Sequence, residues 1–227
     1  ISKMTNEAGD TCWAMSLEKY CKAAVQNVED DLKKVNRALS SKCYTPLTQN
    51  YQPELDSTSE LKAAGVQRYQ ELIGVLQWAV ELGRVDILYE VSRMSSHLAL
   101  PREGHLEQTY HIFGYLKIKP KLRIMFDCSD PAIPANRFKR YDWQDFYRDA
   151  KEAIPPNMPE PRGRCASLSC FVDADLAGNK LNRRSQTGIL IFMMRAPIHW
   201  ISKKQPTVKT STFGAEFCAT KMAVKMI

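Results

Sequence analysis

One short stretch constrains the fold of this chain more than any other, because apolar residues run directly into the acidic tripeptide Asp173-Ala174-Asp175. The apolar residues predict a buried strand, and alternation along a strand places both carboxylates on one face at its end. Two acids in that position repel each other unless a divalent cation neutralises them. Glu216 offers a third carboxylate, since residues 215–227 have the apolar spacing of a helix that could pack on the strand. The residues indicate a metal site, although an isolated Asp-x-Asp is also common in solvated turns.

Positive charge is concentrated around these acids. The whole chain has a net charge of +7, whereas the residues after Asp175 include nine bases and one acid, a net charge of +8. Residues 1–175 therefore carry 23 basic and 24 acidic groups. Such an asymmetry favours a polyanionic substrate such as nucleic acid. The candidates for phosphate and sugar contacts are Arg183, Arg184, Ser185, Lys203, Lys204 and Gln205, although any one of the bases alone also fits an ordinary surface charge.

The pattern of the rest of the chain predicts an α+β fold. Strands are expected at 168–175, 187–195 and 198–202, followed by a helix from Thr212, which gives three antiparallel strands covered by one helix. Residues 14–36 predict an amphipathic helix with Ser16 as its candidate N-cap and with Val35 on its apolar stripe. Further helices are expected at 69–83, 85–98 and 103–116, and an alternating strand at 122–126. Short links between these helices predict antiparallel neighbours.

The segment between these two parts reads as a connector. Residues 137–154 are aromatic, carry charges of both signs and are compatible with a short helix, and residues 154–164 include four prolines. A proline-rich segment of this kind is extended and semi-rigid. Its aromatic residues Trp143, Phe146 and Tyr147 either stack on bases or, as we favour, pack on a neighbouring domain.

Composition excludes several classes of protein. No apolar stretch approaches the roughly 18 to 20 residues of a membrane span. The seven cysteines are scattered without CxxC spacing, which argues for reduced thiols and against a disulfide framework or a zinc site. The N-terminus has no basic region followed by an apolar run, so we expect no signal peptide. Because the sequence starts at Ile1 and not at Met, we expect the chain to be part of a longer product.

Residues 171–217 resemble a known protein family. The segments FVDADLAGNKLNRRSQTGILIF, APIHWISKKQPTVKTST and AEF, in this order and spacing, resemble the ribonuclease H domain of Ty1/copia-type retrotransposon polyproteins. In that family the first Asp and the Glu bind catalytic metal ions, which corresponds to Asp173 and Glu216, with Asp175 as a further candidate ligand. Two departures are Leu176, where Trp is usual, and Phe213-Gly214, where Thr-Glu is common.

The N-terminal half resembles the same polyproteins. SLEKYCKAAV, YQELIGVLQWAVELGRVDILYEVSRMSS, PREGHLEQTYHIFGYLK and LRIMF resemble the reverse transcriptase beyond its palm and through its thumb. The resemblance implies that these helices hold template and primer, because the catalytic aspartates of the polymerase lie N-terminal to this region. It divides the chain into a thumb-like reverse transcriptase region (1–126), a connector (127–165) and the N-terminal half of a ribonuclease H-like domain (166–227).

The activity implied by the resemblance is hydrolysis of the RNA strand of RNA/DNA hybrids with Mg²⁺ or Mn²⁺, in a complete module that contains further acids. The implied partners are an RNA/DNA hybrid and the remaining Pol polyprotein, without a membrane, in a cytoplasmic virus-like particle and the nucleus. Two carboxylates are too few for two metal ions, so we expect no cleavage by this chain alone. Two alternatives stay open: a degenerate, nonenzymatic remnant that binds nucleic acid, and an Asp-x-Asp phosphotransferase of the haloacid dehalogenase type, which Leu176 and Ala177 disfavour.

Overall fold

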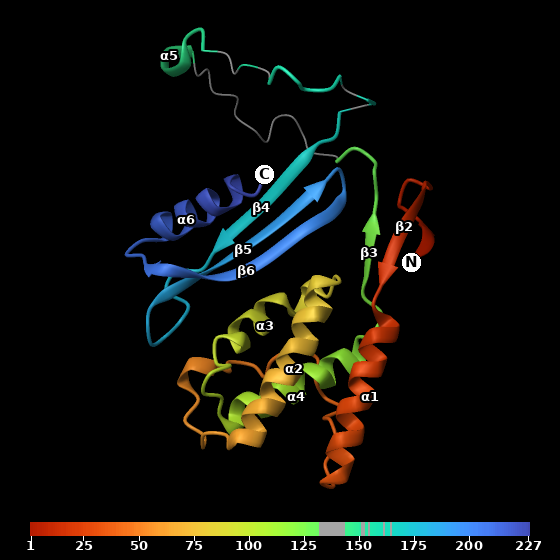
Figure 1. The fold of residues 1–227 in the computed structure, drawn as a ribbon, viewed down its shortest axis with the longest axis vertical. Coiled ribbons are helices and arrows are strands. Elements are labelled where there is room, and N and C mark those ends of the chain that lie inside the picture. Colours follow the sequence, from red (N-terminus) through yellow and green to blue (C-terminus); the bar gives the residue numbers. More distant parts are fainter. Residues whose placement is uncertain (132–143, 151–152, 154, 161, 164) are drawn as a thin grey trace.

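The computed structural model describes residues 1–131, 144–150, 153, 155–160, 162–163 and 165–227. Within these ranges the chain consists of a helical body, a small N-terminal sheet and a second sheet with a helix packed on it (Figure 1). The mixture of helices and antiparallel sheets confirms the α+β class. Trp143 and most of the helix considered for 137–154 lie outside the described residues; α5 (Gln144–Tyr147) is a single turn within that range.

Four α-helices and two 3₁₀ helices make up the helical body. They are α1 (Glu18–Lys34), η1 (Pro53–Leu55), α2 (Ala63–Glu81), η2 (Val85–Ile87), α3 (Leu88–Ser95) and α4 (Glu103–Ile118). Each predicted helix is present, but the first one begins later than expected because residues 14–16 are part of a strand. Leu17, not Ser16, is its N-cap. Val35 follows the last residue of α1 and is 63% exposed, so its predicted place on the buried stripe is wrong.

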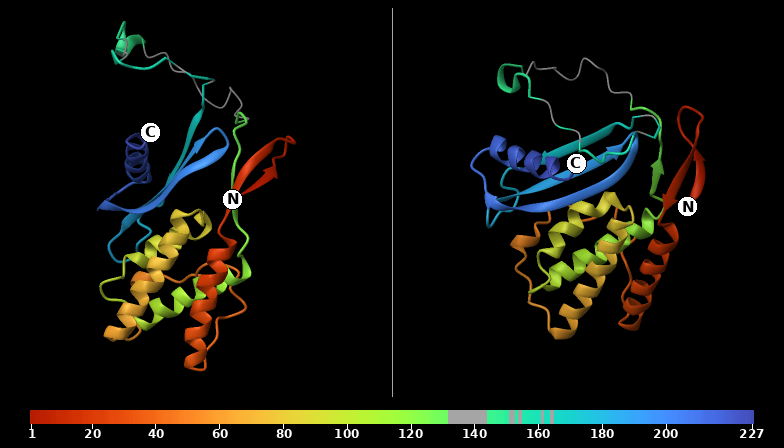
Figure 2. Two further views of the ribbon diagram at one scale, coloured as in Figure 1. Left: turned by 45° about the vertical axis from the view of Figure 1, so that its right-hand side comes forward. Right: turned by 45° about the horizontal axis from the view of Figure 1, so that its top comes forward.

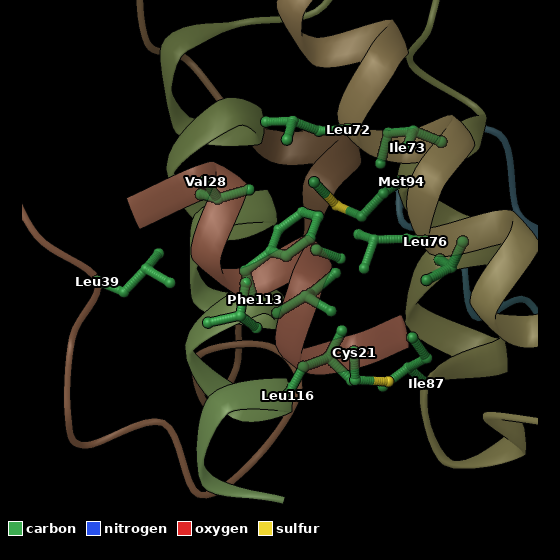
Figure 3. Close-up of a cluster of buried hydrophobic side chains, with 14 of the residues drawn as sticks. Cys21, Val28, Leu39, Leu72, Ile73, Leu76, Ile87, Met94, Phe113 and Leu116 are labelled. Atoms are coloured by element: carbon green, nitrogen blue, oxygen red, sulfur yellow. The ribbon is translucent and has the colours of Figure 1, made fainter. Parts of the chain in front are cut away.

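The core of the helical body is assembled from apolar side chains of all four helices (Figure 3). Phe113 of α4, Leu76 of α2 and Met94 of α3 are completely buried. Burying one side chain of this size stabilises the folded state by about 1.5–3 kcal/mol. Arg84 lies beside this core and is 1% exposed; its guanidinium donates two hydrogen bonds to the carboxylate of Asp86, at 2.9 and 2.8 Å. The body therefore has an apolar core, and the buried guanidinium beside it is paired with a carboxylate.

A small antiparallel sheet stands beside the helical body. Its strands are β1 (Ser2–Thr5), β2 (Thr11–Ser16) and β3 (Arg123–Phe126), in the order β1-β2-β3. The strand expected at 122–126 is thus confirmed, whereas β1 and β2 were not predicted. The turn between them is closed by Asn6, whose side-chain Oδ1 accepts hydrogen bonds from the backbone N–H groups of Ala8 and Asp10.

The second sheet contains β4 (Leu168–Ala174), β5 (Arg184–Met193) and β6 (Ala196–Val208), paired antiparallel in that order. The helix α6 (Thr212–Val224) packs on one face, and the Ser211 Oγ caps it by accepting a hydrogen bond from the Gly214 N–H. Strand order, direction and the following helix agree with the sequence prediction. The strand β6 is longer than expected, because it continues through Lys203 to Val208.

The other face of this sheet lies against α3 of the helical body, so the sheet is placed between α6 and the helices (Figures 1 and 2). Polar contacts fix this arrangement. The Ser92 hydroxyl of α3 donates to the Ser202 carbonyl at 2.7 Å, and the Gln186 amide donates to both serine hydroxyls. The indole N–H of Trp200 donates to the Val80 carbonyl at 2.9 Å. These bonds hold one sheet face at a defined position over the helical body.

Candidate nucleic-acid interface

Asp173 belongs to the face of the sheet that looks toward the helical body. Its neighbours Val172 and Ala174 pack against Ala215 and Ala219 of α6. Because side chains alternate along a strand, Asp173 leaves β4 on the face turned away from α6. Asp173 is exposed, and within the described part of the chain its carboxylate has no hydrogen-bond or ion-pair partner. The carboxylate is therefore available to a ligand or ion.

Asp175 closes the connection between β4 and β5. Its Oδ1 accepts a hydrogen bond from the backbone N–H of Gln186 at 2.6 Å, and its own N–H donates to the Gln186 carbonyl. Its carboxylate also lies against Gly178, where a Cβ would overlap with it. The sequence did not predict this structural role of Asp175. Because its carboxylate already accepts a hydrogen bond, fewer of its lone pairs are available to a cation.

Glu216 lies on α6, half-buried, and within the described ranges its carboxylate has no hydrogen-bond or ion-pair partner. The helix approaches β4 from the side opposite to Asp173. Across the described residues, no group of three or more His, Cys, Asp or Glu side chains is placed to hold a metal ion. Asp173 and Glu216 are thus two available carboxylates on different faces of β4, whereas a hard cation such as Mg²⁺ requires about six oxygen ligands around one point.

The six residues predicted to contact nucleic acid divide into two groups. Arg183, Arg184 and Lys203 are exposed, and Lys204 is partly exposed at the junction with the helical body. These four side chains agree with a surface role. Ser185 and Gln205, by contrast, are 0% and 1% exposed, so their predicted direct contact with phosphate or sugar does not agree with this structure.

Both buried residues have internal partners. The Ser185 Oγ accepts a hydrogen bond from the Ala177 N–H at 3.2 Å, within the β4–β5 connection. The Gln205 amide donates to the Thr187 Oγ1 at 3.0 Å and to the Ala215 carbonyl at 2.9 Å, which ties β6 to β5 and α6. Their roles are to shape the connection and to fix the helix.

A groove of about 670 Å³ separates this sheet face from the helical body. Asp173, Asp175 and Gln186 lie at one end, and Phe171, Leu190 and Trp200 line the rest of the sheet side. Across from them are Val85, Leu88 and Tyr89 of the body. None of these apolar residues was predicted as part of a site. The groove forms only where the helical body packs on the sheet. The sequence pattern of the body or of the sheet alone therefore does not predict it.

A smaller polar cleft adjoins the groove and shares Tyr89, Asp175 and Gln186 with it. It is also lined by four side chains that carry positive charge or can acquire it: Arg93, His97, Arg184 and Lys204. The Arg93 guanidinium forms an ion pair with Glu54 at 2.8 Å. Burial, together with His105 and Lys204, lowers the pKa of His97 from its ordinary 6.5 to about 4. His97 is therefore neutral at pH 7, and because Glu54 neutralises Arg93, the unpaired cations of the cleft are Arg184 and Lys204, with Asp175 also in its lining.

The comparison with curated proteins identifies the chain as a relative of retrotransposon Pol polyproteins, which confirms the resemblance seen in the sequence. It is 27% identical, over 83% of its length, to the retrovirus-related Pol polyprotein from transposon RE1 of Arabidopsis thaliana. It is 28% identical, over 70% of its length, to the corresponding polyprotein from transposon TNT 1-94 of Nicotiana tabacum. A putative transposon Ty5-1 protein of Saccharomyces cerevisiae is 34% identical over 45% of the chain and 30% of that protein.

The chain spans 10% of the length of the RE1 polyprotein and 9% of that from TNT 1-94. No family model matches the chain, and no solved structure matches it. Among the helices of the described residues, none combines the length and the apolar character that crossing a membrane would require.

Proposed function

We propose that this chain is the part of a retrotransposon Pol polyprotein in which a thumb-like helical body and a ribonuclease H-type sheet together bind an RNA/DNA hybrid. The observation that carries the proposal is the exposure of Arg184 and Lys203 on the sheet to which Asp173 belongs, and of Arg183 directly before β5. Their positive charge suits the phosphates of both strands. The RNA strand would be distinguished by its 2′-hydroxyls across the wide minor groove.

In the complete polyprotein, Asp173 and Glu216 are proposed as two of the carboxylates that hold Mg²⁺ or Mn²⁺. Such ions, when bound, activate water and stabilise the leaving oxygen in phosphodiester hydrolysis. Asp173 is suited to this role because its carboxylate is exposed and unpaired within the described chain. Asp175 is proposed to act indirectly, since its hydrogen bond to the Gln186 N–H holds the end of β4 in place.

The chain by itself is proposed to bind the hybrid without cutting it, because two carboxylates provide too few oxygens for two metal ions. The test is to incubate the purified chain with a labelled RNA/DNA hybrid in Mg²⁺ and, separately, in Mn²⁺. We expect a salt-sensitive complex and an intact RNA strand. RNA cleavage that disappears in Asp173→Asn would overturn the proposed inactivity, and the absence of any complex would overturn the proposed binding.

The roles of the acids are separated in the full polyprotein. Asp173→Asn should abolish hybrid-dependent RNA cleavage while leaving the thermal stability unchanged, because its carboxylate has no hydrogen-bond or ion-pair partner among the described residues. Asp175→Asn should retain part of the activity and lower the melting temperature. Equal losses of activity in both variants would refute this division of roles. The second candidate function is a nonenzymatic remnant that binds nucleic acid. A full polyprotein that binds hybrid and never cleaves it would favour this alternative.

A further inference from the structure

We propose that the groove between the second sheet and α3 binds one unstacked nucleotide of a single strand. The base would occupy the aromatic part of the groove, and the phosphate would lie at the mouth of the adjoining basic cleft. The inference rests on the proposed nucleic-acid binding of this chain. It adds to hybrid binding a second mode, in which the chain binds an unpaired base of a single strand. Three features of the groove support it: its shape, its polar end and its charged neighbour.

The shape of the groove depends on Gly188. In the sheet, Asp173 of β4, Gly188 of β5 and Ser202 of β6 lie side by side. Without a side chain, Gly188 leaves a gap in the middle of this row, and a Cβ there would meet nothing nearer than the Asp173 carbonyl oxygen at 4.0 Å. The neighbouring row is apolar and aromatic, because it pairs Phe171, Leu190 and Trp200.

The opposite wall comes from the helical body. Tyr89 of α3 is 43% exposed and borders both the groove and the basic cleft. The ring of Trp200 is held in place by its hydrogen bond to the Val80 carbonyl. A space of about 670 Å³ lies within the usual range for small-molecule sites, and flat aromatic walls are suited to stacking with a base.

The polar end of the groove favours a base that can donate hydrogen bonds. The Asp173 carboxylate borders the Gly188 gap and has no partner among the described residues. An ionised carboxylate only accepts hydrogen bonds, so it fits the amino group of cytosine or adenine, which uracil and thymine lack. Gln186 is already engaged with Ser92 and Ser202. Asp173 is therefore the group expected to select the base.

The basic cleft supplies the charge that a nucleotide needs beside its base. Arg93 is neutralised by Glu54, whereas Arg184 and Lys204 have no acidic partner among the described residues. Cations at this position complement a phosphate group. The cleft has a volume of only about 20 Å³, so the phosphate is placed at its mouth, next to Tyr89, which lines both the cleft and the groove.

The test compares two single strands of equal length and charge: an oligocytidylate RNA and an abasic strand. The wild-type chain should bind the oligocytidylate roughly fivefold or more tightly than the abasic strand, as expected for one stacked base. In Gly188→Val, whose side chain fills the gap, this preference should disappear while binding of the abasic strand stays unchanged. Tyr89→Ala, at an exposed side chain, should also weaken the preference if Gly188→Val proves unstable.

Trp78→Ala is the matched control, because Trp78 is also an exposed aromatic residue of the body but lies outside this groove. It should keep the full preference for the oligocytidylate. Asp173→Asn should reduce the preference for oligocytidylate over oligouridylate. Equal affinities of the wild-type chain for the base-containing and abasic strands would overturn this inference while leaving hybrid binding intact. Failure to bind hybrid as well would instead show that the proposed function is wrong.

Discussion

The helical body and the second sheet differ in the size of the side chains that they bury. The body buries large side chains such as Tyr69, Phe113 and Ile73 in one continuous core. The sheet and α6 meet through the small residues Ala215, Ala219 and Ala223, while aromatic rings such as Phe213 and Phe217 of α6 remain exposed. Because stabilisation scales with the apolar area removed from water, the body contributes most of the stability. The sheet keeps its free charge and its groove at the cost of a smaller core.

The two regions also treat their charges differently. In α1, Lys22, Lys33 and Lys34 each form an ion pair with an acid three or four residues earlier in the helix. In the sheet, Arg184 and Lys203 have no such acid among the described residues. Charges that are already paired attract phosphate less than unpaired ones. We therefore propose that the sheet supplies most of the charge for nucleic-acid binding, whereas the paired charges of α1 contribute little to it.

The largest effect is expected from disrupting the buried ion pair of the body. Arg84→Met removes the partner of Asp86, which is itself only 19% exposed, and breaking a buried pair in this way costs about 3–5 kcal/mol. Urea unfolding followed by circular dichroism should show this loss of unfolding free energy. Arg37→Ala is the control, because its ion pair with Glu107 is exposed and should contribute at most about 1 kcal/mol. Similar losses in both variants would contradict the special role of the buried pair.

A smaller effect is expected where the sheet is held to α6. Gln205→Leu removes the hydrogen bonds to the Thr187 hydroxyl and the Ala215 carbonyl, at a cost of about 1–3 kcal/mol. The loss should appear as faster hydrogen exchange in α6, with exchange in α2 unchanged. Lys203→Gln, at the exposed residue two positions earlier in β6, should leave exchange in α6 unaltered. Unchanged exchange in Gln205→Leu would mean that Gln205 does not hold the helix.

A still smaller effect concerns pH at the junction between the two regions. The pKa of His97 is lowered to about 4 by burial, with His105 and Lys204 adding to the shift, while Glu54 opposes it and Arg93 supports it. The unfolded state, with a pKa near 6.5, binds more protons between pH 6.5 and 4, so this contribution to stability is present above pH 6.5 and is lost as the pH falls toward 4.

Between pH 7 and pH 5, the wild-type chain should therefore lose about 1 kcal/mol more unfolding free energy than His97→Gln, after allowance for partial solvent screening. Urea titrations of both proteins at the two pH values provide the measurement. Identical pH dependence in the two proteins would refute the contribution of His97.

The sequence predicted the local pattern of both regions better than their contacts. The strands β4, β5 and β6 were predictable because apolar alternation and the following helix are local signals. The strand β2 was missed because its partner β3 is more than a hundred residues away along the chain, and β1 was missed with it because β1 pairs only with β2. The burial of Ser185 and Gln205 was not predictable, since tertiary partners decide whether a polar side chain faces solvent. The groove at Gly188 was missed for the same reason.

The most direct test of this account is the salt dependence of RNA/DNA hybrid binding in two variants that remove equal charge. In one, Arg183, Arg184, Lys203 and Lys204 are replaced by Gln; in the other, Lys19, Lys22, Lys33 and Lys34 of α1 are replaced by Gln. The sheet variant should reduce the magnitude of the slope of log K against log salt by up to about 3.6, given a loss of roughly 0.9 for each of four phosphate contacts. The α1 variant should leave the slope nearly unchanged. An equal or larger decrease in the α1 variant would contradict the assignment of nucleic-acid binding to the sheet.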